Sequence, residues 1–297
     1  MKIIVTGSEG FLGTELRKLL GRSHEVIRCD LKRGHDITDV NSFASLFNDD
    51  IDACVHLAAV SNLNIYDDDK KAGGDINVTG TKNIMDLCDR YKIKLFVAST
   101  CCLYGDNGVR VATERSTVSP TEDYARSKLA CEELIKKHNS DRTLITAVSM
   151  RLATFYGGRY ARRALAISIA IEKLVDGQPF MVHGNGNMAR TYTHVLDVAS
   201  GIATLVVNKD ILRYDTYNIT VEHSKTVWDI LSEVSKHCPS RTASFKLTSN
   251  RPTPFSQRII ANSRLKALGW EPKWTWERGI KEAVNTYVKV NKKKWLR

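Results

Sequence analysis

The sequence has little that suits a membrane or an export signal. No segment approaches the roughly 20 continuous apolar residues that a membrane-spanning helix needs. The first residues, Met1–Gly7, form an apolar run that is too short for a secretory signal and leads directly into a glycine turn. We therefore expect a cytoplasmic protein without a membrane partner.

Patterns of cysteine and histidine that bind metals are missing as well. None of the seven cysteines forms a C-x-x-C pair, and histidine and cysteine never cluster at ligand spacing. An odd number of cysteines without such spacing indicates reduced thiols in a cytosol. The sequence thus predicts no metal site.

Acidic residues are fewer than basic ones. The chain has 44 Lys and Arg against 33 Asp and Glu, for a formal net charge of +11. A basic surface can bind nucleic acid, but no zinc finger or RNA-binding sheet motif accompanies the charge. The densest basic run, 292–294, is expected to be a solvated tail. We interpret the charge as an attraction for small anionic ligands and expect no nucleic-acid partner.

Short apolar segments that alternate with helical patterns dominate the first half of the 297 residues. This alternation predicts an α/β fold, with a doubly wound parallel sheet (Rossmann) that helices cover on both faces. The expected strands are 2–6, 25–30, 53–59, 95–100 and 144–151, and the expected helices are 11–20, 77–91 and 124–138.

After about residue 157 the pattern loosens into turn signals and scattered prolines. We predict a smaller mixed α/β C-terminal lobe that binds the substrate, with a stretch near 195–219 returning to the sheet. The cofactor domain would comprise 1–159 and about 192–220, and the substrate lobe about 160–191 and 221–297.

A glycine loop follows the first expected strand and opens the first helix. Its glycines follow the pattern G-x-x-G-x-x-G. Glycines allow a tight turn close to a pyrophosphate, and the helix supplies free N–H groups and a positive dipole end. The alternative is a plain turn, but the strand–loop–helix context favours cofactor binding. The residues predicted to bind the cofactor here are Gly7, Gly10, Phe11, Leu12 and Gly13.

Asp30 closes the second expected strand, 23 residues after Gly7. A carboxylate at this place can accept hydrogen bonds from the adenosine ribose and would repel a 2′-phosphate, which favours NAD as the cofactor. Lys32 and Arg33 follow closely and could instead attract a 2′-phosphate, so NADP stays open.

Tyr124 and Lys128 are four residues apart on an expected helix and therefore share a face. A nearby ammonium and an oxidised nicotinamide would lower the pKa of the phenol, so that Tyr124 can act as a general base. Thr100 ends the preceding strand, where its hydroxyl can bind the same substrate oxygen. The alternatives are a surface Tyr–Lys pair and a threonine that caps a turn.

Taken in order, these motifs resemble the extended short-chain dehydrogenase/reductases, and in particular their nucleotide-sugar epimerase/dehydratase group, over nearly the whole chain. The matching segments include T-G-S-E-G-F-L-G at 6–13, H-L-A-A at 56–59, I-N-V-T-G-T at 76–81, Y-A-R-S-K at 124–128, R-L-A-T-F-Y-G at 151–157 and H-G-N-G-N-M-A-R-T-Y-T-H-V-L-D-V at 183–198.

The resemblance implies roles for further residues. Asp36 and Ile37 would hold the adenine, and Leu57, Ala58 and Ala59 would lie along the cofactor. Thr100, Tyr124 and Lys128 would take the catalytic roles of the family. Arg190, Tyr192 and Arg251 would bind the substrate's diphosphate, and a homodimer would form through the helices at 77–91 and 122–138.

Three positions depart from the family pattern. Thr154 stands where many members have an asparagine that touches the substrate, and Pro254 stands where an aspartate often follows the second arginine. Cys101 and Cys102 occupy the place of the Asp-Glu pair of the 4,6-dehydratases, which argues against dehydration.

The function that these observations favour is NAD-dependent epimerisation at C4 of a nucleotide sugar, as in UDP-glucose 4-epimerase. A nucleotide-4-keto-sugar reductase that uses NAD(P)H is the second hypothesis. A catalytically silent, cofactor-sensing binding module is a third hypothesis of another class, although such a module has no need of the set Thr100, Tyr124 and Lys128.

Overall fold

The computed structural model describes most of the chain. The described ranges are 1–61, 70–105, 110–140, 142–158, 165–238, 244–248 and 259–291. Some of the residues discussed above lie outside these ranges, namely Arg251, Pro254 and the basic run 292–294. Within the described ranges, no helix is both long and apolar enough to cross a membrane.

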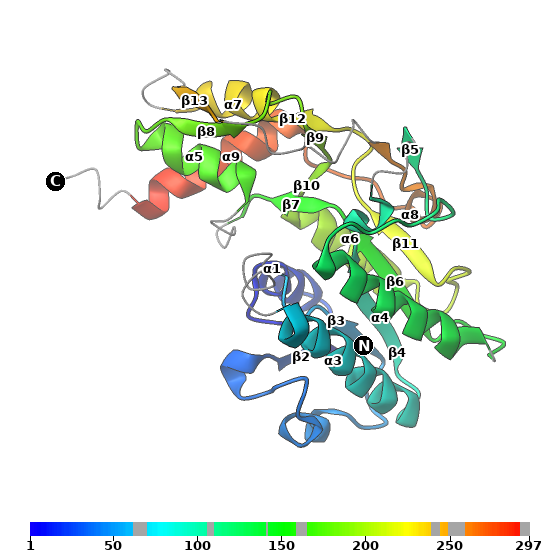
Figure 1. Ribbon diagram of the computed structural model, residues 1–297. Helices are drawn as coiled ribbons and strands as arrows, with labels where there is room; N and C mark the ends of the chain where they lie inside the picture. Colours follow the sequence, from blue (N-terminus) through cyan, green and yellow to red (C-terminus); the bar gives the residue numbers. More distant parts are fainter. Residues whose placement is uncertain are drawn as a thin grey trace.

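A parallel sheet of six strands forms the centre of the molecule (Figure 1). Its strand order is β11-β6-β4-β3-β1-β2. Starting from β1, the chain adds β2 on one side and then β3, β4, β6 and β11 on the other, as in doubly wound folds. This confirms the α/β fold class. The strands are β1 (Lys2–Thr6), β2 (Glu25–Cys29), β3 (Ala53–His56), β4 (Lys94–Thr100), β6 (Ala147–Leu152) and β11 (Thr216–Ile219).

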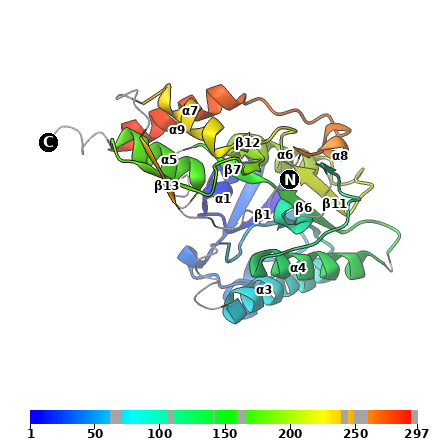
Figure 2. The same cartoon turned by 45° about the horizontal axis from the view of Figure 1, so that its top comes forward.

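Helices cover both faces of the sheet because its strands are apolar on both sides. On β1, Ile3 and Val5 join a core with α1 (Phe11–Leu20) and α6 (Val195–Val207). Ile4, which points the other way, joins a second core with α3 (Lys70–Arg90) and α4 (Asp123–Ser140). Helices α3 and α4 lie side by side in both views (Figures 1 and 2).

Two strand boundaries differ from the expected ones by three residues, and the other differences are of one residue. β3 ends at His56 rather than at residue 59, because the N–H groups of Leu57 and Ala58 both donate to Thr6 Oγ1, each at 3.1 Å. The chain therefore turns across the end of β1. β6 begins at Ala147, and Asn139 Oδ1 accepts the N–H groups of Thr146 at 3.1 Å and Ala147 at 3.2 Å, which ties the start of the strand to α4.

The C-terminal region builds a separate hydrophobic cluster, which includes Ile171, Val234 and Ile280. It gathers above the sheet at the upper left of Figure 1. The elements of the C-terminal region are α5 (Ala166–Val175), β8 (Phe180–His183), α7 (Val227–Ser235), β13 (Phe245–Thr248) and α9 (Trp276–Asn291).

Short strand pairs and one short helix make the connections. The pairs are β7 (Thr154–Tyr156) with β10 (Tyr192–His194), β9 (Ala189–Arg190) with β12 (Lys225–Thr226), and β5 (Val111–Ala112) with β14 (Ile259–Ile260); the helix is α8 (Ser263–Lys266).

Residues 195–219 return the chain to the sheet. Helix α6 packs against α1, and β11 pairs with β6 at the sheet edge. Asp197 of α6 accepts the N–H groups of Lys273 at 2.9 Å and Trp274 at 3.1 Å. The indole of Trp274 stacks on His194, with 3.9 Å between ring centroids. These contacts attach the segment before α9 to the sheet domain.

Candidate active site

A cavity of about 1020 Å³ opens where the sheet strands end. Its lining begins at the carboxyl ends of β1, β2, β3, β4 and β6, with Gly7, Asp30, Leu57, Thr100 and Leu152. The carboxyl edge at a reversal of strand order is where open α/β sheets bind ligands.

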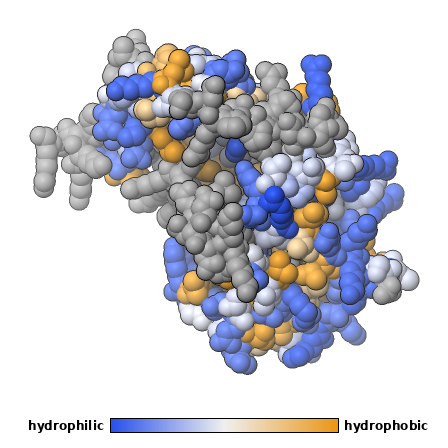
Figure 3. Space-filling view, viewed as in Figure 1, coloured by the Kyte–Doolittle hydropathy of each residue, from blue (hydrophilic) through white to orange (hydrophobic). Residues whose placement is uncertain are grey.

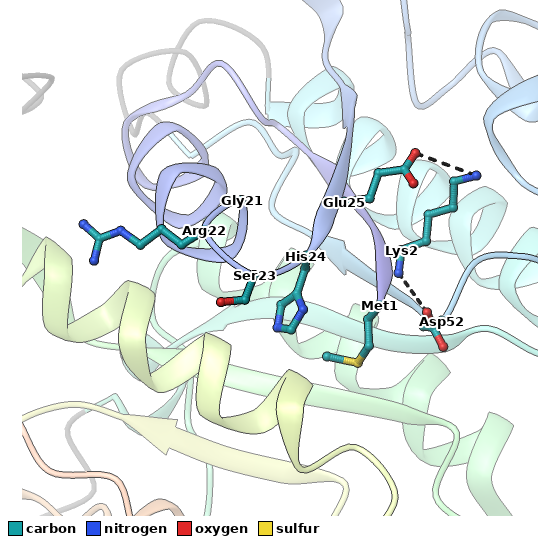
Figure 4. Close-up of a pocket in the computed structure, with 8 residues that line it drawn as sticks. All are labelled: Met1, Lys2, Gly21, Arg22, Ser23, His24, Glu25 and Asp52. Carbon is teal, nitrogen blue, oxygen red and sulfur yellow. Dashed lines mark hydrogen bonds and ion pairs between the residues drawn. The ribbon is translucent and has the colours of Figure 1, made fainter.

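A second, shallow hollow lies at the opposite edge, where β1 and β2 begin (Figure 4). The N–H group of Lys2 donates to Asp52 Oδ2 at 2.8 Å, and the Lys2 ammonium lies 3.7 Å from Glu25 Oε1. Since this hollow is shallow and both Asp52 and Glu25 are bonded to Lys2, we take the cavity at the carboxyl edge as the candidate site.

The glycine loop is tight enough that side chains would not fit. Gly7 has a φ of +66°, and a Cβ there would lie 2.8 Å from the nitrogen of Ala58. A Cβ at Gly13 would lie 2.1 Å from the carbonyl oxygen of Gly7. Gly10 precedes α1, whose first turn has neither a side-chain cap nor an acidic residue. The positive end of α1 thus meets the cavity, which fits a pyrophosphate.

Asp30 lies at the end of β2 and lines the cavity. Its Oδ2 accepts the N–H group of Glu9 at 2.9 Å, and its Oδ1 accepts that of Lys32 at 3.0 Å. These bonds hold the carboxylate beside the glycine loop. The side chains of Lys32 and Arg33 are exposed, and neither residue is among those that line the cavity.

Asp36 and Ile37 line the same end of the cavity. Asp36 Oδ1 accepts the N–H group of Thr38 at 2.9 Å and thereby fixes the turn. Ile37 is buried against α3, where Gly80 leaves room, because a Cβ at Gly80 would come within 2.3 Å of Ile37 Cδ1.

His56 lies behind the turn that carries Leu57, Ala58 and Ala59. The hydroxyl of Thr6 accepts the N–H groups of Leu57 and Ala58, so its own hydrogen is available for His56 Nδ1 at 2.7 Å. Burial, followed by the charge of Lys128, lowers the pKa of His56 from 6.5 to about 3. The imidazole is therefore neutral, with its proton on Nε2.

The structure brings Thr100, Tyr124 and Lys128 to one cavity. Thr100 ends β4, and its Oγ1 accepts the N–H group of Cys102 at 3.1 Å. This bond fixes the hydroxyl at the end of the strand, where it lines the cavity. Tyr124 is half-buried in the first turn of α4, and Lys128, one turn later, is only 2% exposed. Burial lowers the pKa of the Lys128 ammonium.

A buried ionic network stands behind these residues, and the sequence analysis did not find it. Glu132 of α4 and Arg151 of β6 form an ion pair of 2.6 Å. Glu132 Oε1 also accepts the hydroxyls of Ser99 at 2.6 Å and Ser149 at 2.8 Å, while Arg151 donates to the hydroxyl of Tyr104 at 3.0 Å. Burial alone would lower the pKa of Arg151, but the hydrogen bonds and the charge of Glu132 raise this pKa.

The part of the cavity around Tyr124 carries both charged and neutral groups. Burial raises the pKa of the thiols of Cys101 and Cys102, so both are neutral at physiological pH. Glu122, two residues before Tyr124, also lines the cavity, and the sequence analysis missed it because no motif marks this position. Arg190 of β9 contributes the positive charge.

Among the described residues, one predicted substrate residue does not line the cavity. Tyr192 is only 6% exposed, and its ring packs 6.2 Å from that of Trp276 in the hydrophobic cluster of the C-terminal region. Arg251 lies outside the described residues. The predicted residues that line the cavity are Gly7, Gly10, Phe11, Leu12, Gly13, Asp30, Asp36, Ile37, Leu57, Ala58, Ala59, Thr100, Tyr124, Lys128, Thr154 and Arg190.

No metal cluster accompanies this cavity in the part of the chain that the structure describes, where no three His, Cys, Asp or Glu side chains could together hold an ion.

Comparison with known proteins agrees with this geometry. The sequence model of the NAD dependent epimerase/dehydratase family matches residues 3–220. The chain is 27% identical to a provisionally named UDP-glucose 4-epimerase of Methanocaldococcus jannaschii, over 95% of this chain and 97% of that protein. It is 24% identical to dTDP-glucose 4,6-dehydratase 1 of Escherichia coli, over 100% of this chain and 94% of the relative.

Solved structures show the same fold. The crystal structure of the Thermus thermophilus UDP-glucose 4-epimerase in complex with NAD superposes with a TM-score of 0.84, over 97% of this chain and 99% of that chain, at 24% identity. The family match spans well over half of the sequence. The chain therefore belongs to the NAD dependent epimerase/dehydratase family and uses NAD as its cofactor.

Proposed function

We propose that the protein is a nucleotide-sugar C4 epimerase that acts on a UDP-hexose. The observation that carries the proposal is the meeting of Thr100, Tyr124 and Lys128 in one cavity with the glycine loop and Asp30. A cofactor site and a general base in one cavity are what a reversible oxidation at a sugar carbon requires.

Tyr124, Thr100 and Lys128 have different roles in the reaction at C4. Tyr124 removes the proton of the C4 hydroxyl, and the hydroxyl of Thr100 donates a hydrogen bond to the same oxygen. The buried ammonium of Lys128 stabilises the phenolate electrostatically. When bound, NAD supplies the hydride acceptor and donor. Rotation of the 4-keto sugar in the cavity exposes its opposite face, and Tyr124 then returns the proton to give the epimer.

Binding of the nucleotide part falls to Arg190 and Thr154, which line the cavity from β9 and β7. A guanidinium fork suits a diphosphate because it can donate two parallel hydrogen bonds. We extend the proposed diphosphate site to Arg251 on the family resemblance alone.

The two cysteines favour epimerisation over dehydration. Eliminating water from a 4-keto sugar needs an acid and a base beside the neighbouring carbons. Cys101 and Cys102 occupy the place of the dehydratases' Asp-Glu pair, and burial keeps both thiols neutral by raising their pKa. Neither thiol therefore supplies a base at neutral pH.

A panel of nucleotide sugars tests the proposal. UDP-, dTDP- and GDP-hexoses are incubated with purified protein and no added reductant, and the products are identified by NMR. We expect the C4 epimer of at least one UDP-hexose. The epimerase proposal fails if no epimer forms while a 4-keto sugar oxidises added NADH or NADPH stoichiometrically, since that outcome identifies a reductase. A protein that binds NAD and turns over none of these substrates is the silent binding module.

We also propose a cytoplasmic homodimer that forms through α3 and α4. These helices pack side by side. Figure 3 shows hydrophobic residues in small groups among hydrophilic ones on the lower part of the face that it draws. Light scattering should give twice the mass of the 33.3 kDa chain; a monomer mass at micromolar concentration would contradict the dimer.

A further inference from the structure

Glu9, the third residue of the glycine loop, carries a carboxylate that none of the roles above uses. Its backbone N–H group donates to Asp30 Oδ2 at 2.9 Å. Glu9 is therefore fixed beside the carboxylate that is expected to meet the adenosine ribose.

The Glu9 carboxylate holds two arginines. Its Oε2 lies 3.4 Å from Arg17 Nη2, and its Oε1 lies 3.5 Å from Arg28 Nη1. Arg28 and Asp30 are two residues apart at the end of β2, so both point toward α1, the side on which Val26 packs. A guanidinium group thus lies on the same side of β2 as Val26 and is already paired with Glu9, the residue that bonds to Asp30.

We propose that Glu9 is a second determinant of the preference for NAD over NADP, which acts by occupying Arg28. A guanidinium is the preferred protein group for a phosphate. With Glu9 in place, an incoming 2′-phosphate meets the charge of Asp30 and no available guanidinium. Without the Glu9 charge, Arg28 can turn to the phosphate and offset the repulsion.

Glu9 pairs with both arginines, but the position of the Arg28 guanidinium depends more on this pairing than that of Arg17 does. Arg17 Nε also donates to the carbonyl oxygen of Ser8 at 3.2 Å, which keeps its guanidinium against the loop. Arg28 has no second hydrogen-bond or ion-pair partner among the described residues, and its side chain is 42% exposed against 27% for Arg17. Removing the Glu9 charge therefore frees Arg28 first.

Glu9→Gln tests the proposal, because it keeps the size of the side chain and the backbone bond to Asp30 while removing the charge. NAD and NADP are titrated calorimetrically into the variant without any sugar, at low ionic strength because salt screens exposed charges. We expect the affinity for NADP to rise about fivefold, as for one exposed ion pair, and the affinity for NAD to change less than about twofold.

Two further variants complete the test. Glu25→Gln removes the same charge from an ion pair with Lys2 at the far end of β2 (Figure 4) and should change neither affinity. Glu9→Gln combined with Arg28→Gln should return the NADP affinity to the wild-type value. The proposal is overturned if Glu9→Gln leaves NADP affinity unchanged, if NAD affinity rises equally, or if the gain persists without Arg28.

The inference goes beyond the epimerase proposal and does not rest on it. All readouts are cofactor affinities of the full chain, so a failed epimerase assay leaves the expected NADP shift intact. An absent shift, in turn, leaves the proposed reaction untouched.

Discussion

Tyr124 is the residue on which the proposed chemistry depends, because it supplies the base. Tyr124→Phe keeps the ring and removes the hydroxyl. Turnover should fall roughly 100- to 10,000-fold, the usual contribution of a general acid–base group, while NAD affinity is unchanged. Steady-state kinetics and NAD titration measure the two effects.

A matched variant separates this effect from a general loss of a tyrosine hydroxyl. Tyr91 follows α3 and is partly buried against the core between that helix and the sheet, away from the cavity lining. Tyr91→Phe should keep wild-type turnover. If Tyr124→Phe keeps more than a tenth of wild-type activity, Tyr124 is not the base.

His56 should make stability depend on pH. Its pKa in the folded protein is about 3, against an ordinary value of 6.5. As the pH falls below 6.5, His56 therefore becomes protonated in the unfolded chain, whereas in the folded chain it stays neutral until about pH 3. The free energy of unfolding should decrease as the pH falls through this window, by up to about 1.4 kcal/mol per pH unit.

Urea unfolding at several pH values between 7.5 and 5 measures this dependence. His56→Gln should be less stable than wild type near neutral pH and should show a shallower decline on acidification. Equal slopes for wild type and His56→Gln would show that this imidazole is not held neutral.

At the scale of elements, the ion pair of Glu132 and Arg151 fixes α4 on the sheet. Both side chains are nearly buried, so removing one partner leaves an uncompensated charge in the interior. Glu132→Gln and Arg151→Met should each lower the free energy of unfolding by about 3–5 kcal/mol. Combining them removes both charges, and the double variant should be more stable than either single variant.

Denaturant unfolding of the three variants forms a double-mutant cycle. Lys82→Met breaks an ion pair with Asp86 on the exposed side of α3 and is the control, with an expected loss of less than about 1 kcal/mol. Additive losses from Glu132→Gln and Arg151→Met would mean that the two charges do not support each other.

The sequence predicted the elements best where the signal is local. The glycine loop and the Tyr124–Lys128 pair were predictable because spacing along one helix or one turn fixes their arrangement. The end of β3 was not predictable, since the apolar run continues through Ala59 while the backbone turns toward Thr6. The pairing of Glu132 with Arg151 was missed because it depends on how α4 lies on β6, which no local pattern encodes.

At the scale of the whole molecule, the two sides of the cavity differ in how far the sequence predicts them. The cofactor side is built on the ends of sheet strands, whose order follows from the doubly wound connections. The other side comes from two- and three-residue strands such as β9 and β7. A family position on so short a strand does not fix which way a side chain points, and Tyr192 points into the hydrophobic cluster while Arg190 lines the cavity.

The central claim is that one cavity removes and returns the hydrogen at C4 of a nucleotide sugar. The most direct measurement supplies a UDP-hexose that is deuterated at C4, without added reductant, and follows the label in the epimer by mass spectrometry. The product should keep its deuterium at C4, because the hydrogen taken from the sugar never leaves the cavity. Product that has lost the label to solvent, or turnover that requires added NADH or NADPH, would contradict the account.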